Sequence, residues 1–82
     1  MLNLLYILRV NILKNKIQAY RKTKGLSQEE LAQKCKVSRQ TINAIENDKY
    51  DPSLQLAFTL SHVLGLSIEE LFIFKYEGDG SK

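Results

Sequence analysis

The stretch QEELAQKCKVSRQTINAIEN, residues 28–47, has the pattern of two short helices joined by a sharp turn. Ser27 precedes the first helix and Glu30 follows three residues later, which is the arrangement of a capping box. Ser38 can cap a second helix, so the break between the two helices is encoded locally. The residues expected to face inward from the helices and the turn are Leu31, Ala32, Cys35, Val37, Ile42 and Ile45.

Polar side chains crowd the start of the second predicted helix, from Ser38 to Thr41. In proteins that insert a helix into the major groove of DNA, this part of the helix contacts the base edges. Arg39 can offer two donors to the O6 and N7 atoms of guanine, and Gln40 can bond the N6 and N7 atoms of adenine. The sequence therefore predicts a helix-turn-helix motif with residues 38–47 as its recognition helix.

Positive charge is concentrated in the half of the chain that contains this motif. The 82 residues carry a net charge of +3. Residues 1–41 hold nine basic and two acidic residues, which gives +7, and the remaining residues contribute −4. A basic half around a recognition helix suits a polyanionic partner. The nine basic residues are Arg9, Lys14, Lys16, Arg21, Lys22, Lys24, Lys34, Lys36 and Arg39.

Cys35 is the only cysteine in the sequence, so no internal disulfide can form and a reducing cytoplasm is expected. Its neighbours Lys34 and Lys36 could favour a thiolate and hence a redox role. The favoured interpretation is a small hydrophobic side chain in the angle between the helices.

The first 13 residues, MLNLLYILRVNIL, are strongly apolar. They are too few to cross a bilayer, which needs about 20 residues, and Arg9 interrupts them. They also lack the basic start and the cleavage site of a signal peptide. Three interpretations remain open: an arm that packs on the domain or on a partner, a weak anchor at a membrane surface, or a mis-called translation start.

Three further helices are predicted outside the central pair. Residues 13–24 have a helical pattern, and Gly25 is expected to end that helix in a left-handed conformation. Ser53 caps a helix that ends at Gly65, and Ser67 opens a last short helix with a second capping box.

The predicted organisation is thus all-α, in three parts. Residues 1–13 are an apolar extension, residues 14–75 form one five-helix domain, and residues 76–82 are a polar tail that we expect to be disordered. A chain of this size buries roughly 60% of its unfolded surface, enough for one core and too little for an enclosed catalytic pocket.

The segment LSQEELAQKCKVSRQTINAIENDKYDPSLQLAFTLSHVLGLSIEELF resembles the Cro and phage-repressor (Xre) family of helix-turn-helix regulators. It is most similar to compact bacterial members that consist of the DNA-binding domain alone. The resemblance covers residues 14–75, and its most specific parts are LSQEELA, VSRQTI, IENDKYDPSL and GLSIEELF. One departure is Lys36, at a turn position where the family commonly has glycine; a left-handed residue with a Cβ costs roughly 1 kcal/mol.

This resemblance implies a phage-repressor-like domain that binds a double-stranded DNA operator in the bacterial cytoplasm. It implies a homodimer on DNA and regulation as a repressor or an activator, with repression as the expected sign. The exposed dimer surface is expected at Phe72, Ile73 and Phe74, and residues 1–13 are the other candidate. The resemblance also pairs Arg21 with Glu46 as a structural ion pair.

The resemblance further assigns the contacts of the expected DNA-binding face. It implies that Gln28 bonds a DNA phosphate and braces Gln40. The alternative for each residue of the face is a solvated polar side chain with no DNA contact. The base-facing set is Arg39, Gln40 and Ala44, with Ser38, Thr41 and Asn43 nearby, and Asn47 and Lys49 lie at phosphate-contacting positions.

A second class of function remains open, namely an antitoxin-like or adaptor module that uses the same fold to bind proteins. An enzyme is disfavoured, because His62 is the only histidine and there is no glycine-rich phosphate loop. His62 also lacks the paired cysteines or clustered acids that a metal site would need. We therefore expect no catalytic residues, no metal, no cofactor and no small-molecule substrate.

Overall fold

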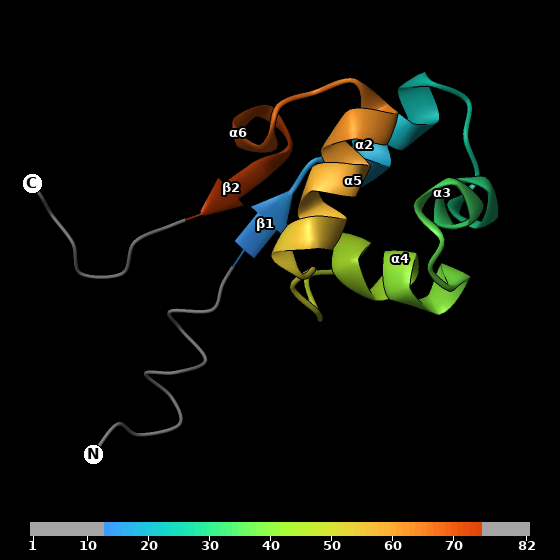
Figure 1. The fold of residues 1–82 in the computed structure, drawn as a ribbon, viewed down its shortest axis with the longest axis horizontal. Coiled ribbons are helices and arrows are strands. Elements are labelled where there is room, and N and C mark those ends of the chain that lie inside the picture. Colours follow the sequence, from blue (N-terminus) through green and yellow to red (C-terminus); the bar gives the residue numbers. More distant parts are fainter. Residues whose placement is uncertain (1–12, 75–82) are drawn as a thin grey trace, which may run out of the picture.

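The computed structural model describes residues 13–74, and over this range five helices alternate with short turns (Figure 1). The five-helix prediction is confirmed. The predicted apolar extension, except for Leu13, and the predicted tail of residues 76–82 lie outside the described residues. The elements in chain order are β1 (Leu13–Asn15), α2 (Ile17–Thr23), α3 (Gln28–Cys35), α4 (Arg39–Glu46), α5 (Leu54–Leu64), α6 (Ile68–Leu71) and β2 (Phe72–Phe74).

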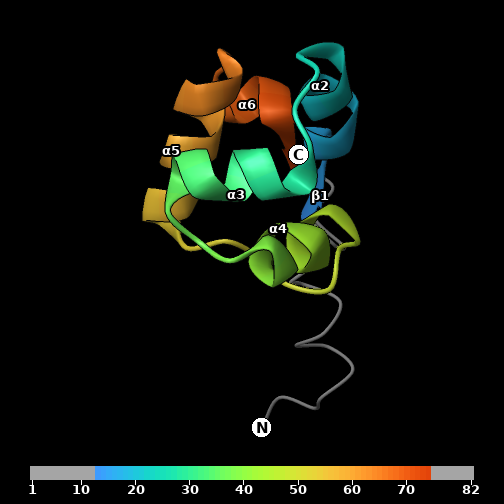
Figure 2. The ribbon, with the colours of Figure 1, turned by 90° about the vertical axis from the view of Figure 1, so that its right-hand side faces the viewer.

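Helix α3 crosses α4 and also packs against α5 (Figure 2). The turn between α3 and α4 takes the left-handed conformation at Lys36, where φ is +62° and ψ is +40°. Lys36, at the turn position where the family commonly has glycine, therefore has the left-handed conformation that was expected there. Gly25 and Gly65, which were expected to end two helices, also have positive φ.

Serine side chains start four of the helices, as the sequence predicts. Each serine hydroxyl oxygen accepts a hydrogen bond from the backbone N–H three residues later, at 3.0–3.1 Å. Both predicted capping boxes form, because the Glu30 and Glu70 carboxylates accept from the backbone N–H of their serines at 2.8 Å. The hydrogen bonds between Glu30 and Ser27 lower the pKa of the Glu30 carboxyl. The four serines are Ser27, Ser38, Ser53 and Ser67.

A two-stranded antiparallel sheet joins the two ends of the described chain, and this element was not predicted. Leu13 pairs with Phe74 and Asn15 with Phe72. The expected first helix, residues 13–24, is therefore too long at its start. Asn15 explains the boundary, because its side-chain oxygen accepts from the Ile17 N–H at 3.0 Å while its amide donates to the Ile45 carbonyl at 2.8 Å.

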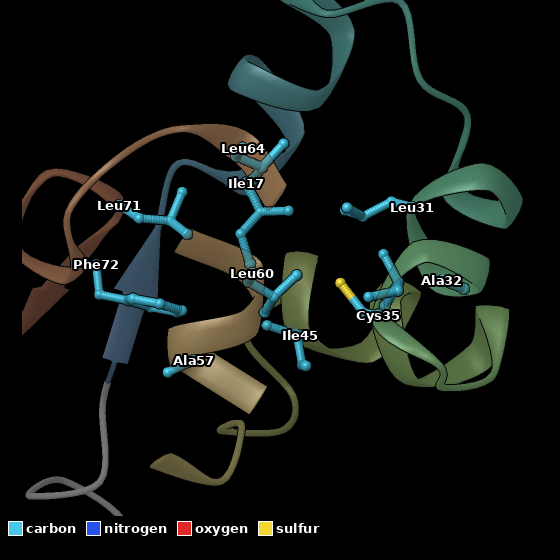
Figure 3. Close-up of a cluster of buried hydrophobic side chains, with 11 residues drawn as sticks. Ile17, Leu31, Ala32, Cys35, Ile45, Ala57, Leu60, Leu64, Leu71 and Phe72 are labelled. Carbon is cyan, nitrogen blue, oxygen red and sulfur yellow. The ribbon is translucent and has the colours of Figure 1, made fainter. Parts of the chain in front are cut away.

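The core lies where the five helices converge with β2 (Figure 3). Phe72 is only 8% exposed and belongs to this core, so the expectation that it lies in an exposed dimer surface is wrong. Leu54, at the start of α5, lies outside this core and is 72% exposed. The buried set is Ile17, Leu31, Ala32, Cys35, Ile42, Ile45, Ala57, Leu60, Leu64, Leu71 and Phe72.

Cys35 is buried between the crossing helices, as the hydrophobic interpretation expected. Burial raises the pKa of its thiol, which favours the neutral form over the reactive thiolate. Over residues 13–74, no helix combines the length and the apolar composition that crossing a membrane requires.

Candidate nucleic-acid interface

The two faces of α4 differ sharply in exposure and polarity. Ile42 and Ile45 are 0% and 1% exposed, and they fix the helix to the core. The opposite face begins with Arg39 and Gln40, both of which are exposed, and continues with Asn43 one turn later. Helix α4 is therefore held rigidly from behind while its polar side chains are presented to the surroundings.

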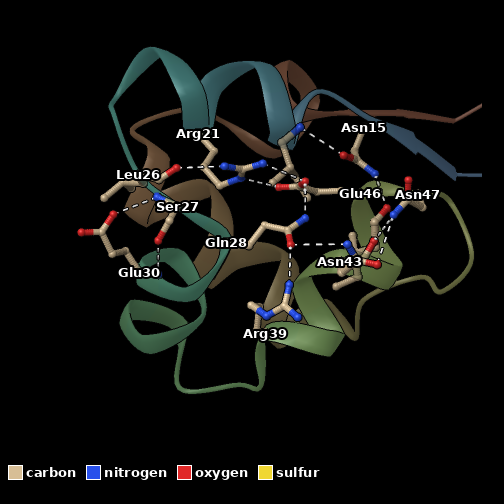
Figure 4. A network of polar contacts seen from close by, with 12 residues as sticks. Asn15, Arg21, Leu26, Ser27, Gln28, Glu30, Arg39, Asn43, Glu46 and Asn47 are labelled. Carbon is tan, nitrogen blue, oxygen red and sulfur yellow. Dashed lines mark hydrogen bonds and ion pairs between the residues drawn. The ribbon is translucent and has the colours of Figure 1, made fainter.

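An ion pair behind α4 ties it to α2 (Figure 4). The Arg21 Nε donates to Glu46 Oε2 at 2.7 Å, and its Nη2 donates to Glu46 Oε1 at 3.1 Å. The remaining Nη1 donates to the Leu26 carbonyl at 2.9 Å. The two side chains are 9% and 3% exposed, and the hydrogen bond to Glu46 raises the pKa of Arg21. The structure thus brings together the two residues that the resemblance paired.

Gln28, at the start of α3, extends this network toward the exposed face of α4 (Figure 4). Its Nε2 donates to Glu46 Oε1 at 3.0 Å. Its Oε1 accepts from Arg39 Nη1 and from Asn43 Nδ2, each at 3.3 Å. The expected brace to Gln40 is not formed: within residues 13–74, the Gln40 side chain is exposed and has no hydrogen-bond partner. The amide of Gln28 is directed to Glu46 and Arg39 instead, because their charged groups provide stronger partners.

A second set of polar contacts lies at the C-terminal end of α4. Asn47 Nδ2 donates to the Asn43 backbone carbonyl at 2.8 Å and lies 3.2 Å from Asn43 Oδ1. At the start of the helix, the Ser38 and Thr41 hydroxyl oxygens are 2.9 Å apart. Ala44 is half-buried between these two ends.

The loop after α4 places Lys49 in an exposed position next to the helix end. The Lys49 backbone N–H donates to the Ala44 carbonyl at 2.9 Å, and Asp48 has a left-handed φ of +59°. Asp48 also pairs with Lys14 of β1, with 3.4 Å between carboxylate and ammonium. Sequence reasoning did not predict these roles for Lys14 and Asp48, because their contact depends on the unpredicted strand.

The structure brings Gln28, Arg39 and Asn43 together at the start of α3 and on the outer side of α4. Thr41 instead lines a hollow with Val37 and Tyr50. Over residues 13–74, no group of three or more histidine, cysteine or acidic side chains is arranged to hold a metal ion. The chemistry available on this face is hydrogen bonding and positive charge.

Comparisons with known proteins identify the same motif. The model of the helix-turn-helix family matches residues 17–71. An uncharacterized HTH-type transcriptional regulator of Methanocaldococcus jannaschii is 54% identical over 63 residues, which are 77% of this chain and 96% of that protein.

Solved structures with this fold include regulators from bacteria. The crystal structure of SinR, the master regulator for biofilm formation, in complex with DNA has a TM-score of 0.61 and 39% identity. The match covers 65% of this chain and 86% of the SinR chain. The restriction-modification controller protein C.AhdI of Aeromonas hydrophila has a TM-score of 0.63 and 29% identity, over 67% of this chain and 80% of that one.

Proposed function

Because the chain belongs to the helix-turn-helix family of the Cro and phage-repressor (Xre) type, we propose that it regulates transcription by binding double-stranded DNA. The recognition helix, residues 38–47, enters the major groove. The observation that carries this proposal is the exposed pair Arg39 and Gln40 on a helix whose other face is completely buried. A helix that is packed on the core and exposes polar groups at its start is what direct contact with base edges requires.

The proposed contacts divide into base recognition and backbone positioning. Arg39 and Gln40 contact bases, and Ser38, Thr41, Asn43 and Ala44 line the same groove. Asn47 and Lys49 contact phosphates at the end of the helix. The exposed Lys49 ammonium attracts the negative phosphate there.

Selection of bound fragments from random DNA tests this function directly. The expected result is an enriched sequence with two related half-sites. An antitoxin-like or adaptor function predicts no enriched sequence, and in that case the protein should be tested for protein partners instead.

A homodimer on DNA is the second part of the proposal. One recognition helix contacts too few base pairs to define a unique site, and related regulators place two half-sites about one helical turn apart. An exposed apolar strip on α5, α6 and β2 supports such an assembly. The strip, named here the α5–β2 strip, consists of Leu54 (72% exposed), Phe58 (58%), Ile73 (42%) and Phe74 (42%), with half-buried Ile68 between them.

Phe58→Asp tests the dimer because it places a charge in the middle of the α5–β2 strip. The matched control is Gln18→Asp, which adds the same charge at an exposed position of α2 outside the strip. In sedimentation on operator-length DNA, the first variant should bind one copy per operator, because cooperative binding to the second half-site is lost, while the control still binds two copies. Two copies per operator for both variants would mean that the dimer interface lies outside the α5–β2 strip.

Repression of a chromosomal promoter requires no catalysis and no cofactor, so we propose that the protein is not an enzyme and acts in the cytoplasm. Its relatives come from Methanocaldococcus jannaschii as well as from Bacillus subtilis. The bacterial origin that the resemblance implied therefore does not follow from membership of the family.

A further inference from the structure

The α5–β2 strip borders two hollows on neighbouring elements, since α6 packs against both α5 and β2 (Figure 1). Leu54 and Phe58 line the first hollow, of about 540 Å³, and Ile73 lines the second, of about 500 Å³. Ile68 and Glu69 line both, so the two hollows adjoin. Hollows of roughly 300–1,000 Å³ are of the size that holds a bound group. The strip is therefore concave, and it can receive a segment of chain.

Two polar groups in the walls of these hollows lack partners within residues 13–74. Ser61 lines the first hollow and is 4% exposed, and its hydroxyl oxygen makes no hydrogen bond within the described chain. A peptide backbone could satisfy this hydroxyl, because it offers both an N–H donor and a carbonyl acceptor. Glu69 is the only acidic side chain among the described residues that line the hollows, and it forms no ion pair with them or with any other described residue. These features favour an apolar stretch of chain that carries one positive charge.

Residues 1–12 of this chain have that composition. Seven of the twelve are leucine, isoleucine or valine, and Arg9 has the only charged side chain. Packing such a segment on the α5–β2 strip removes apolar surface from water on both sides of the contact, which is favourable. The segment precedes residues 17–71, the range that the family model matches, so membership of the family assigns it no role.

The point of attachment brings this segment to the strip. Leu13 begins β1 and lines the second hollow together with Glu69. Arg9 precedes Leu13 by four residues, which span at most about 14 Å when extended, so the Glu69 carboxylate is within its reach. A tethered segment also has an effective concentration in the millimolar range, which favours binding to its own molecule over binding to a second copy.

We propose that residues 1–12 occupy the α5–β2 strip of their own molecule, with Arg9 paired to Glu69, and thereby compete with the second copy for this surface. This inference rests on the proposed homodimer. Dimer formation then requires the segment to leave the strip. The apparent affinity between two copies is lowered in proportion to the fraction of molecules whose strip is open.

Hydrogen exchange of the full chain, at two protein concentrations and without DNA, tests where the segment binds. The amides of residues 1–12 should be protected, and equally so at both concentrations. Glu69→Arg should lower this protection about threefold, the size of an exposed ion pair, and the double variant Arg9→Glu/Glu69→Arg should restore it. The matched control is Glu29→Arg, which changes an exposed acid at the same position after the capping serine of α3 and should leave the protection unchanged. An unprotected segment, or protection that rises with concentration, would overturn the proposal.

Sedimentation of the full chain without DNA tests the competition. Arg9→Glu places two like charges together at Glu69, so it should release the segment and tighten dimer formation about threefold. Lys16→Glu is the control, because it makes the same charge change at an exposed position outside the strip. Weaker dimer formation in Arg9→Glu would mean that the segment bridges two copies, and unchanged dimer formation would mean that it does not compete. Either result would overturn the proposal.

The intact mass of the protein from its native cells should include residues 1–12, and a shorter product would also overturn the proposal. Neither the exchange nor the sedimentation measurement uses DNA. Absence of an enriched operator sequence would therefore overturn the proposed function while leaving the result for the segment intact.

Discussion

The α3–α4 pair and the β1–β2 sheet are stabilised by contacts of very different range along the chain. In the helix pair, the serine caps and the left-handed turn at Lys36 join residues no more than five positions apart. In the sheet, Leu13 pairs with Phe74, and these are the first and last residues of the described chain. The conformation of the α3–α4 turn and caps is therefore specified locally, while the sheet, which supports the end of α4 through Asn15, is specified by distant pairing.

The buried ion pair of Arg21 and Glu46 ties α4 to α2, and its removal should have the largest effect. Glu46→Ala leaves the buried Arg21 charge without its carboxylate partner, which should reduce the free energy of unfolding by roughly 3–5 kcal/mol. The exposed pair of Lys14 and Asp48 is the control, and Lys14→Ala should cost less than about 1 kcal/mol. Thermal denaturation checks both. Equal melting temperatures for the two variants would show that the buried pair contributes no more to stability than the exposed one.

The sheet contributes to stability through one face of β2. Phe72→Ala should destabilise the protein by about 3–5 kcal/mol, because the ring is buried in the core. Ile73→Ala, at the next residue on the opposite face of the strand, should change the free energy of unfolding by about 0.5 kcal/mol or less. Urea titration of both variants measures the difference. Similar losses would mean that Ile73 is also buried in solution.

Local capping of α4 should have a smaller effect than either of these changes. Ser38→Ala removes the acceptor for the Thr41 N–H and should cost about 1 kcal/mol. Thr23→Ala is a control at an exposed hydroxyl that bonds only the Ala19 carbonyl, and it should be nearly neutral. Chemical denaturation compares the two, and a neutral Ser38→Ala would indicate that α4 does not depend on its cap.

The turn between the helices is expected to show the smallest effect, and with the opposite sign. Lys36→Gly relieves the left-handed strain of a residue with a Cβ and should stabilise the protein by about 0.5 kcal/mol. Lys34→Gly, two residues earlier inside α3, should instead destabilise it by about 1 kcal/mol. A loss of stability in both variants, measured by calorimetry, would contradict the assignment of strain to Lys36.

The parts of the fold that the sequence predicted are those encoded by neighbouring residues. The caps at Ser27 and Ser38 and the glycine positions were predicted because each needs only the residues of one turn. The sheet was not predicted, since two strands of three residues have no periodicity to recognise. For the same reason Phe72 was grouped with its exposed neighbours, although alternation along a strand places it on the inner face.

The candidate site was predicted as a set of positions, and its internal contacts were not. The partner of Gln28 was expected to be Gln40, but the charges of Glu46 and Arg39 orient the amide toward them. Such competition between possible partners depends on side-chain distances, which a sequence does not contain. Asn15, which supports the end of α4 from β1, has no signal in the sequence that distinguishes it from any polar residue.

Comparison of Arg39→Ala with Lys49→Ala tests most directly the claim that α4 recognises bases while the neighbouring loop contacts phosphates. Affinities are measured at two salt concentrations, for the selected operator and for a scrambled one. Arg39→Ala should lower discrimination between the two sequences by roughly 1–3 kcal/mol. Lys49→Ala should weaken binding to both sequences alike. It should also reduce the slope of log affinity against log salt concentration by about one unit. An equal loss for both sequences in Arg39→Ala would contradict base recognition by α4.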